Sequence, residues 1–341
     1  MSALNFFEII FSDFYVFLTL AVTLGVAFVS GWTDAPNAIS SCVATRCLPL
    51  KKAVVLAAIC DFSGSLIMGL FSGRVMETVF NLADFSSNGI SAVCIAMISV
   101  VVWAVTAWYF GIPTSESHAL MAALLGSGVA VNGSFSSFDS SEWIKVIYGL
   151  ALSLFLGFAS GFVSSWLTVT VFYKKDKFQA DMFFSRSQIF ASALMAFMHG
   201  AQDSQKFTGI IMLVVSLAGK QSVNSQVSPI ILLLAPAAIA FGTASGGARI
   251  IKSVGIDMIK MRKDMGFSAD MAGAFCLFLS TVFGLPVSTT HTKTSAVLGV
   301  GAFKSVKSVN WSIAGEMVSA WVLTFPGCAL MSYVITKLIC R

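Results

Sequence analysis

The stretch GIPTSESHALMAALLGSG, residues 111–128, recurs at residues 284–301 as GLPVSTTHTKTSAVLGVG. The two copies align without a gap, and Gly, Pro, Ser, His, Ala, Leu and two later Gly residues keep the same register. Upstream, at a similar offset, Gly31-x-x-Asp34-x-x-Asn37 matches Gly200-x-x-Asp203-x-x-Lys206. Two motifs repeated in the same order indicate that the chain is an internal duplication.

The composition predicts that lipid is the solvent of this chain. Of its 341 residues, 57% are hydrophobic and only 11% are charged, which is too much apolar surface for one water-soluble core. A spanning helix needs roughly 20 apolar residues. Such runs lie at 14–31, 53–71, 90–110, 146–172, 188–199 continuing through 209–218, 228–248 and 311–336. We therefore expect an all-α integral membrane protein that crosses the cytoplasmic membrane of the cell several times.

Lys and Arg fall in short groups between the apolar segments, although the formal net charge is +5. This distribution is typical of cytoplasmic loops, so we expect no nucleic-acid partner. Four groups are expected inside: Arg46 with Lys51 and Lys52, Lys174 to Arg186, Arg249 to Lys263, and Lys304 with Lys307. The more acidic stretches 73–89 and 132–142 are expected outside.

These loop assignments predict opposite orientations for the two halves. Segment 90–131 must begin and end outside, and segment 268–303 inside, each as a re-entrant hairpin or as two crossings. We therefore predict two inverted-topology repeats whose broken or re-entrant helical hairpins meet at the membrane midplane, with both termini outside. The predicted units are residues 1–173, a cytoplasmic linker at 174–187, and residues 188–341.

Each copy of the longer motif breaks one helix and starts another with hydroxyl side chains. The start of a helix exposes unpaired N–H groups and the positive end of the helix dipole, and Ser and Thr add uncharged donors. Two such starts facing each other would bind an anion; the alternative is a pair of ordinary N-caps at loop ends. The candidate anion-binding hydroxyls are those of Thr114, Ser115, Ser117, Ser288, Thr289 and Thr290.

Asp34 and Asp203 stand inside apolar segments, where an ionised carboxylate is costly without a partner. Asn37 and Lys206 lie one helical turn further on, on the same faces. We expect this pair of aspartates to hold a coupling cation, sodium or a proton. The alternative is that each aspartate makes a structural hydrogen bond to nearby backbone.

Four motifs together resemble the inorganic phosphate transporter (PiT) family, and the chain is similar to its bacterial members. They read GWTDAPNA, PTSESH, HGAQDSQK and PVSTTH, in the family's order. The resemblance implies cation-coupled symport of inorganic phosphate by a homodimer. It implies that Ser115, Ser117, Ser288, Thr289 and Thr290 contact phosphate, and that Asp34, Asn37 and Asp203 bind or order the cation.

The chain departs from the family's pattern at four positions. Thr33 and Gln202 stand where sodium-coupled members tend to have Asn, Lys206 replaces the second Asn, and Glu116 stands opposite Thr289. These departures resemble the branch thought to use protons, although Thr and Gln oxygens can still ligate sodium. We place Lys206 with the substrate-binding residues, and Thr33, Gln202 and Glu116 with those that couple a proton or a cation. We also expect Glu116 and Lys206 to form a buried ion pair.

Competing functions remain open at the level of sequence. A sulfate permease of the same family would bind the same tetrahedral shape. An anion channel fits poorly with the buried carboxylates, and an intramembrane hydrolase would need Ser115 activated by His118. Because a nucleophile is needed once and both copies of the motif carry hydroxyls, we expect no enzyme. We expect no cofactor, and no metal other than sodium at Asp34 and Asp203.

Overall fold

The computed structural model describes residues 3–82, 85, 89–110, 114–135, 138–219, 228–246 and 258–340. Among these residues the regular secondary structure is helical, without an assigned strand. The first half forms α1 (Ala3–Ser12), α2 (Phe14–Thr33), α3 (Ala35–Ala44), α4 (Leu50–Phe71), α5 (Arg74–Phe80), α6 (Gly89–Phe110), α7 (Glu116–Asn132) and α8 (Ser140–Phe172). The second half forms α9 (Lys177–Gly219), α10 (Pro229–Ala244), α12 (Lys263–Val282), α13 (Thr289–Lys304), the 3-10 turn η2 (Val306–Ser308) and α14 (Trp311–Ile339).

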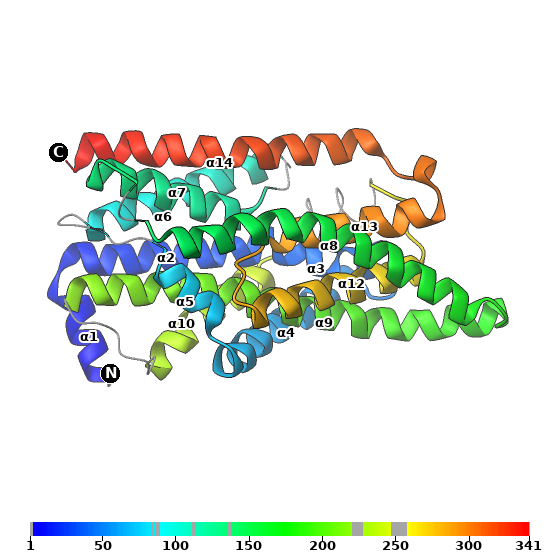
Figure 1. Ribbon diagram of the computed structural model, residues 1–341. Helices are drawn as coiled ribbons and strands as arrows, with labels where there is room; N and C mark the ends of the chain where they lie inside the picture. Colours follow the sequence, from blue (N-terminus) through cyan, green and yellow to red (C-terminus); the bar gives the residue numbers. More distant parts are fainter. Residues whose placement is uncertain are drawn as a thin grey trace.

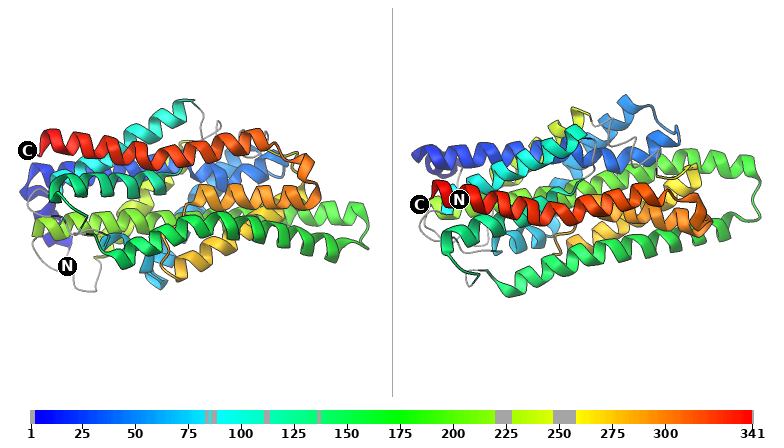
Figure 2. Two further views of the ribbon diagram at one scale, coloured as in Figure 1. Left: turned by 45° about the horizontal axis from the view of Figure 1, so that its top comes forward. Right: turned by 90° about the horizontal axis from the view of Figure 1, so that it is seen from above.

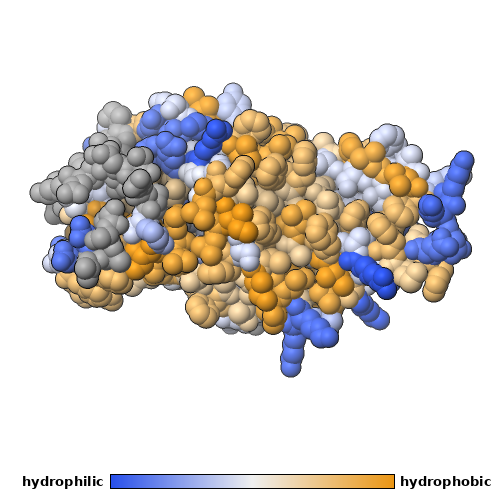
Figure 3. Space-filling model, turned by 90° about the horizontal axis from the view of Figure 1, so that it is seen from below, coloured by the Kyte–Doolittle hydropathy of each residue, from blue (hydrophilic) through white to orange (hydrophobic). Residues whose placement is uncertain are grey.

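The helices form an elongated bundle with an apolar surface. In the described residues, six helical stretches are long and apolar enough to cross a membrane. Hydrophobic side chains cover much of the middle of the molecule, and hydrophilic ones gather toward its ends (Figure 3). The predicted class, an all-α membrane protein with several passes, is confirmed.

Helices α7 and α13 are the short arms of two helical hairpins. They have 17 and 16 residues, fewer than the roughly 20 that a spanning helix needs. Helix α7 packs on α6, and α13 packs on α12. The short second arms favour the re-entrant alternative over two full crossings. Pro113, where the first hairpin was expected to turn, lies outside the described residues.

One residue explains why the first half has two helices where the second has one. Pro36 follows the end of α2, and a proline removes an N–H and clashes with the preceding helical turn. The chain therefore breaks at Asp34, between α2 and α3. Gln205 stands at the matching position of the second half, and α9 continues unbroken for 43 residues.

Helix α9 includes most of the segment that was predicted to be a linker. Residues 177–187 already belong to α9, so the irregular connection from α8 is confined to residues 173–176. The helix extends because the stretch KFQADMFFSRS contains no Pro or Gly to stop it. The division into units at 174–187 stays a prediction.

Equivalent helices of the two halves make equivalent contacts. Helix α4 packs on α9 and its counterpart α10 on α2, while α13 packs on α8 and α7 on α14. Helices α8 and α14 run in opposite directions, and the described chain begins and ends at the same end of the bundle (Figures 1 and 2). Glycines allow close approach in the equivalent contacts of α7 with α14 and of α13 with α8. A Cβ at Gly126 would collide with the carbonyl of Ala329, and a Cβ at Gly299 would collide with the carbonyl of Phe158.

Candidate functional site

The starts of α7 and α13 meet tip to tip inside the bundle. Ser115 and Ser288 are the N-caps, and their hydroxyls accept hydrogen bonds from the backbone N–H of His118 and His291 respectively. Both serines are fully buried, and the Ser115 hydroxyl donates to the Ser288 hydroxyl across 2.8 Å. The structure therefore brings together the two helix starts that the sequence placed in separate halves.

The remaining predicted hydroxyls surround these tips. Thr114, Ser117, Thr289 and Thr290 are all buried. Ser117 Oγ donates to the Val287 carbonyl at 3.2 Å, which ties the first tip to the second. Thr290 Oγ1 donates to Asp34 Oδ1 at 2.6 Å, and Thr289 Oγ1 lies 3.5 Å from Asp203 Oδ2. The tip of the second hairpin is thereby linked to both predicted aspartates.

The helix break at Asp34 gathers a buried group of acidic and amide side chains. Asn37 Nδ2 donates to Thr290 Oγ1 at 3.1 Å, one turn from Asp34. Thr33 Oγ1 donates to Glu116 Oε1, while Glu116 Oε2 is buried without a hydrogen-bond partner among the described residues. The carboxyl groups of Glu116 and Asp34 interact electrostatically within this buried group. Two ionised carboxylates in one buried group repel each other, so a proton bound by either of them would relieve that repulsion.

Lys206 occupies the equivalent place beside Asp203. Its Nζ donates to Asp203 Oδ1 at 2.6 Å, to Ser117 Oγ at 2.6 Å and to the Val287 carbonyl at 2.7 Å. The expected ion pair between Lys206 and Glu116 is wrong in this conformation. Asp203, one helical turn away on α9, is the nearer partner, and Glu116 is held by α2 instead.

Gln202 and Thr33 occupy matching positions, each directly before one of the two aspartates, but they make different contacts. Gln202 Nε2 donates to the Leu285 carbonyl at 2.7 Å and its Oε1 accepts from Thr281 at 2.7 Å. From α5, Thr78 Oγ1 donates to the Gly284 carbonyl at 2.9 Å. These bonds satisfy carbonyls of the turn between α12 and α13, so Gln202 helps to position the second hairpin.

Sequence reasoning missed the role of His199. Its Nδ1 lies 3.0 Å from Asp61 Oδ1, its Nε2 lies 3.3 Å from Asp203 Oδ2, and the ring is fully buried. Thr243 Oγ1 donates to Asp61 Oδ2 at 2.7 Å. The available signals were the unrepeated acid at Asp61 and the spacing of His199 one turn before Asp203.

The geometry does not support a hydrolytic Ser–His pair. The Ser115 hydroxyl is engaged with Ser288, while the His118 ring packs edge-on against the His291 ring, with centroids 4.3 Å apart. His118 reaches Ser115 through its backbone N–H only, as an N-cap contact among the described residues. A general base must reach the hydroxyl with its ring nitrogen.

The assembled site can bind an oxyanion and neutralise charge. Two helix N-termini and hydroxyls supply donors, Lys206 supplies the positive charge, and the carboxyls supply acceptors. Every one of these groups is buried. Buried charges of both signs in a membrane bundle are typical of a site through which ions pass.

Comparison with known proteins agrees with this chemistry. The sequence matches the phosphate transporter family over residues 30–332. A protein of Rhizobium meliloti named "Probable low-affinity inorganic phosphate transporter" is 36% identical over 313 residues, covering 92% of this chain and 93% of its own. A Bacillus subtilis protein of the same name is 34% identical, covering 92% and 95%.

A solved structure shares the fold. That protein is named "The sodium-dependent phosphate transporter", and it aligns with a TM-score of 0.85 at 21% identity over 96% of this chain and 99% of its own. The resemblance carried by the four motifs is thus confirmed over the length of the chain. The protein is a membrane transporter rather than an enzyme, and it belongs to the phosphate transporter family.

Proposed function

We propose that this protein is a proton-coupled symporter that carries inorganic phosphate across the cell membrane by alternating access. The observation that supports this most directly is the contact between the Ser115 and Ser288 N-caps, because it aims two buried helix N-termini at one point. A phosphate that separates the two hydroxyls, which are hydrogen-bonded to each other at 2.8 Å here, would accept hydrogen bonds from both tips and from Lys206.

Phosphate is favoured over sulfate by the acceptors beside the tips. At the second tip, Asp34 accepts a hydrogen bond from Thr290, and Asp203 accepts one from Thr289. Phosphate at neutral pH carries hydroxyl protons that it can donate to such acceptors, whereas sulfate carries none. Carboxylates that accept hydrogen bonds from phosphate would find no donor on sulfate and would only repel it.

A proton is favoured over sodium by what already surrounds the two aspartates. The Lys206 ammonium forms an ion pair with Asp203, at the place where a coupling cation would otherwise bind. Glu116 and Asp34 are interacting buried carboxyl groups, so a proton bound by either one would relieve their repulsion beside the substrate. Because the structural relative is named for sodium, the uptake experiment on this chain must include that ion as the alternative.

The same proposal includes the arrangement in the membrane. The two halves act as inverted repeats, consistent with their matching helix contacts, and the basic end where α8 and α9 meet lies in the cytoplasm. Inverted repeats let either hairpin move against the rest while the site between the tips stays shared. The homodimer implied by the family remains part of the proposal.

Uptake into proteoliposomes tests the substrate and the coupling ion together. An inward proton gradient is expected to drive labelled phosphate to accumulate, and an equal sodium gradient at fixed pH is not. Sulfate uptake is expected to be at least about tenfold slower, since it leaves acceptors unpaired. Accumulation driven by sodium alone would reverse the coupling assignment, and equal uptake of both anions would reverse the substrate assignment.

Serine-to-alanine variants of the two N-caps test the shared tips. Ser115→Ala and Ser288→Ala each remove a donor to a buried anion, which costs about 1.5 to 3 kcal/mol, or roughly 10- to 150-fold in phosphate affinity. Ser127→Ala is the matched control, because Ser127 is buried on the same α7 and its hydroxyl donates to the Leu124 carbonyl within that helix. Equilibrium binding of labelled phosphate measures the effect. Wild-type affinity in either N-cap variant would show that the anion is not held between both tips.

Glu116→Gln tests the proton carrier. A glutamine amide resembles a protonated carboxyl but cannot release a proton, so phosphate exchange at equal pH should continue while accumulation driven by a pH gradient is lost. Glu142→Gln, at the start of α8 where Glu142 pairs with Lys145, should change neither measurement. Proton-driven accumulation at the wild-type rate in Glu116→Gln would remove Glu116 from the coupling mechanism.

A further inference from the structure

A second buried charge cluster lies away from the hairpin tips. The ammonium of Lys293 on α13 forms an ion pair with Asp270 on α12, and both side chains are fully buried. Lys293 Nζ also donates to Ser41 Oγ at 2.7 Å. From α9, Gln188 Nε2 and Ser192 Oγ donate to Asp270 Oδ2 at 2.6 and 2.5 Å.

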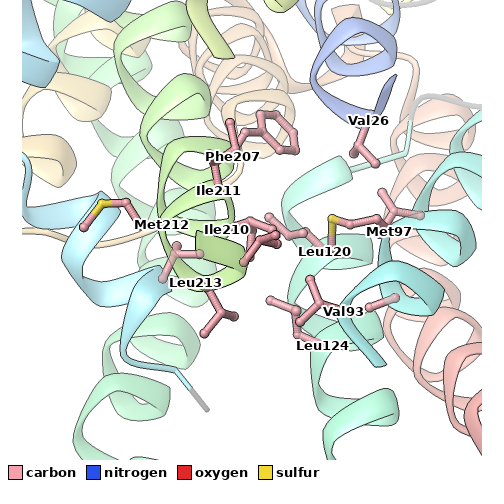
Figure 4. Packing of buried hydrophobic residues seen from close by; sticks show 14 of the residues in the cluster. Val26, Val93, Met97, Leu120, Leu124, Phe207, Ile210, Ile211, Met212 and Leu213 are labelled. Carbon is pink, nitrogen blue, oxygen red and sulfur yellow. The ribbon is translucent and has the colours of Figure 1, made fainter. Parts of the chain in front are cut away.

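In the first half the positions equivalent to the ion pair and to Ser41 are apolar, while Thr19 and Thr23 match Gln188 and Ser192. The register that aligns residues 111–128 on 284–301 places Met97 at Asp270 and Leu120 at Lys293, and the register of the Asp motifs places Ile210 at Ser41. Met97, Leu120 and Ile210 belong to one buried hydrophobic cluster (Figure 4). The chain therefore stabilises this position with hydrocarbon in one half and with charge in the other.

That difference shows that packing alone does not require the ion pair. Burying two charges costs several kcal/mol per ion before their attraction offsets it, and apolar residues of similar size often stabilise as well or better. In a membrane protein, buried ionisable residues mark the paths of ions and substrates.

The position of the cluster connects the site to one end of the molecule. On α3, Ser41 lies one turn beyond Asn37 and one turn before Thr45. On α13, Lys293 lies one turn beyond the tip residues Thr289 and Thr290. The cluster is thus the next polar layer after the tips.

Beyond the cluster, where α8 ends and α9 begins, lies a cavity of about 630 Å³. Basic side chains outnumber acidic ones in its lining, which includes Arg46, Lys175, Lys177, Arg262, Lys263, Asp181 and Asp264. Gln188 Oε1, between cavity and tips, is buried without a hydrogen-bond donor among the described residues. This oxygen can accept a hydrogen bond from a protonated group that moves past it.

We propose that Lys293 is a second anion station on the cytoplasmic exit path of phosphate, and that Asp270 closes this path by pairing with Lys293. The inference rests on the proposed phosphate transport. Phosphate that leaves the tips replaces Asp270 as the partner of Lys293 and then enters the basic cavity. The first half has no charged pair at the equivalent positions, so its apolar cluster closes the opposite side by packing.

The chain supplies its own test variant for this gate. The double variant Asp270→Met with Lys293→Leu installs the residues of the first half at the equivalent positions. It should retain its melting temperature and bind phosphate within about threefold of the wild type, because the tips are untouched. Its initial rate of proton-driven phosphate uptake should fall at least about tenfold, because the anion loses its charged station.

A second variant tests the same gate independently, in case the double variant does not fold. Ser41→Ile installs the residue of the first half beside Lys293 and leaves the charged pair intact. It should also slow uptake more than it weakens binding, and Ile210→Val in the apolar cluster is the matched control with wild-type uptake. Lys293→Arg keeps the charge and should restore most of the rate that Lys293→Leu loses.

Wild-type uptake in either the double variant or Ser41→Ile would show that the cluster is only structural. Failure of the wild-type protein to bind or move inorganic phosphate would instead overturn the proposed function. The two failures are therefore distinguishable in one series of measurements.

Discussion

Breaking two helices in the middle of an apolar bundle leaves their first N–H groups without carbonyl partners, where no water can replace them. The Ser115 and Ser288 hydroxyls satisfy one such group on each helix, at His118 and His291. The other early N–H groups of both helices have the same need, and the proposed anion between the tips would meet it. Helices α8 and α14 hold the tips in place by close packing at Gly299 and Gly126, where no larger residue fits.

Charge around the tips is the physical basis of the proposed coupling between substrate and proton. A bare pair of carboxylates would repel an anion, but Lys206 neutralises Asp203, and in the proposed mechanism a proton bound by Asp34 or Glu116 cancels one of their two charges. Removing that proton would leave two negative charges beside the substrate. Whatever favours the proton there therefore favours phosphate by the same free energy, since coupling between two binding sites is reciprocal.

The sequence predicts the local parts of this arrangement well. The duplication and the hydroxyl-bearing helix starts at Ser115 and Ser288 were read directly from short motifs. The helix break at Pro36 was not predicted, although its cause is equally local. Which side chains meet across the bundle could not be predicted, because that depends on which helices become neighbours. Glu116 therefore faces Thr33 rather than Lys206, and His199 joins Asp61 to Asp203 across α4 and α9. Asp270 and Lys293 pair for the same reason, and only comparison of the two halves reveals that their charge is unusual.

The central claim is that one phosphate is held between both helix N-termini. Solid-state NMR of the purified protein in lipid, with ¹⁵N-labelled backbone and bound inorganic phosphate, measures ³¹P–¹⁵N dipolar couplings directly. The account predicts couplings at hydrogen-bonding distance, with about 2.7 to 3.2 Å from nitrogen to phosphate oxygen, for amides in the first turns of both α7 and α13. Couplings confined to one helix, or absent from both, would contradict it.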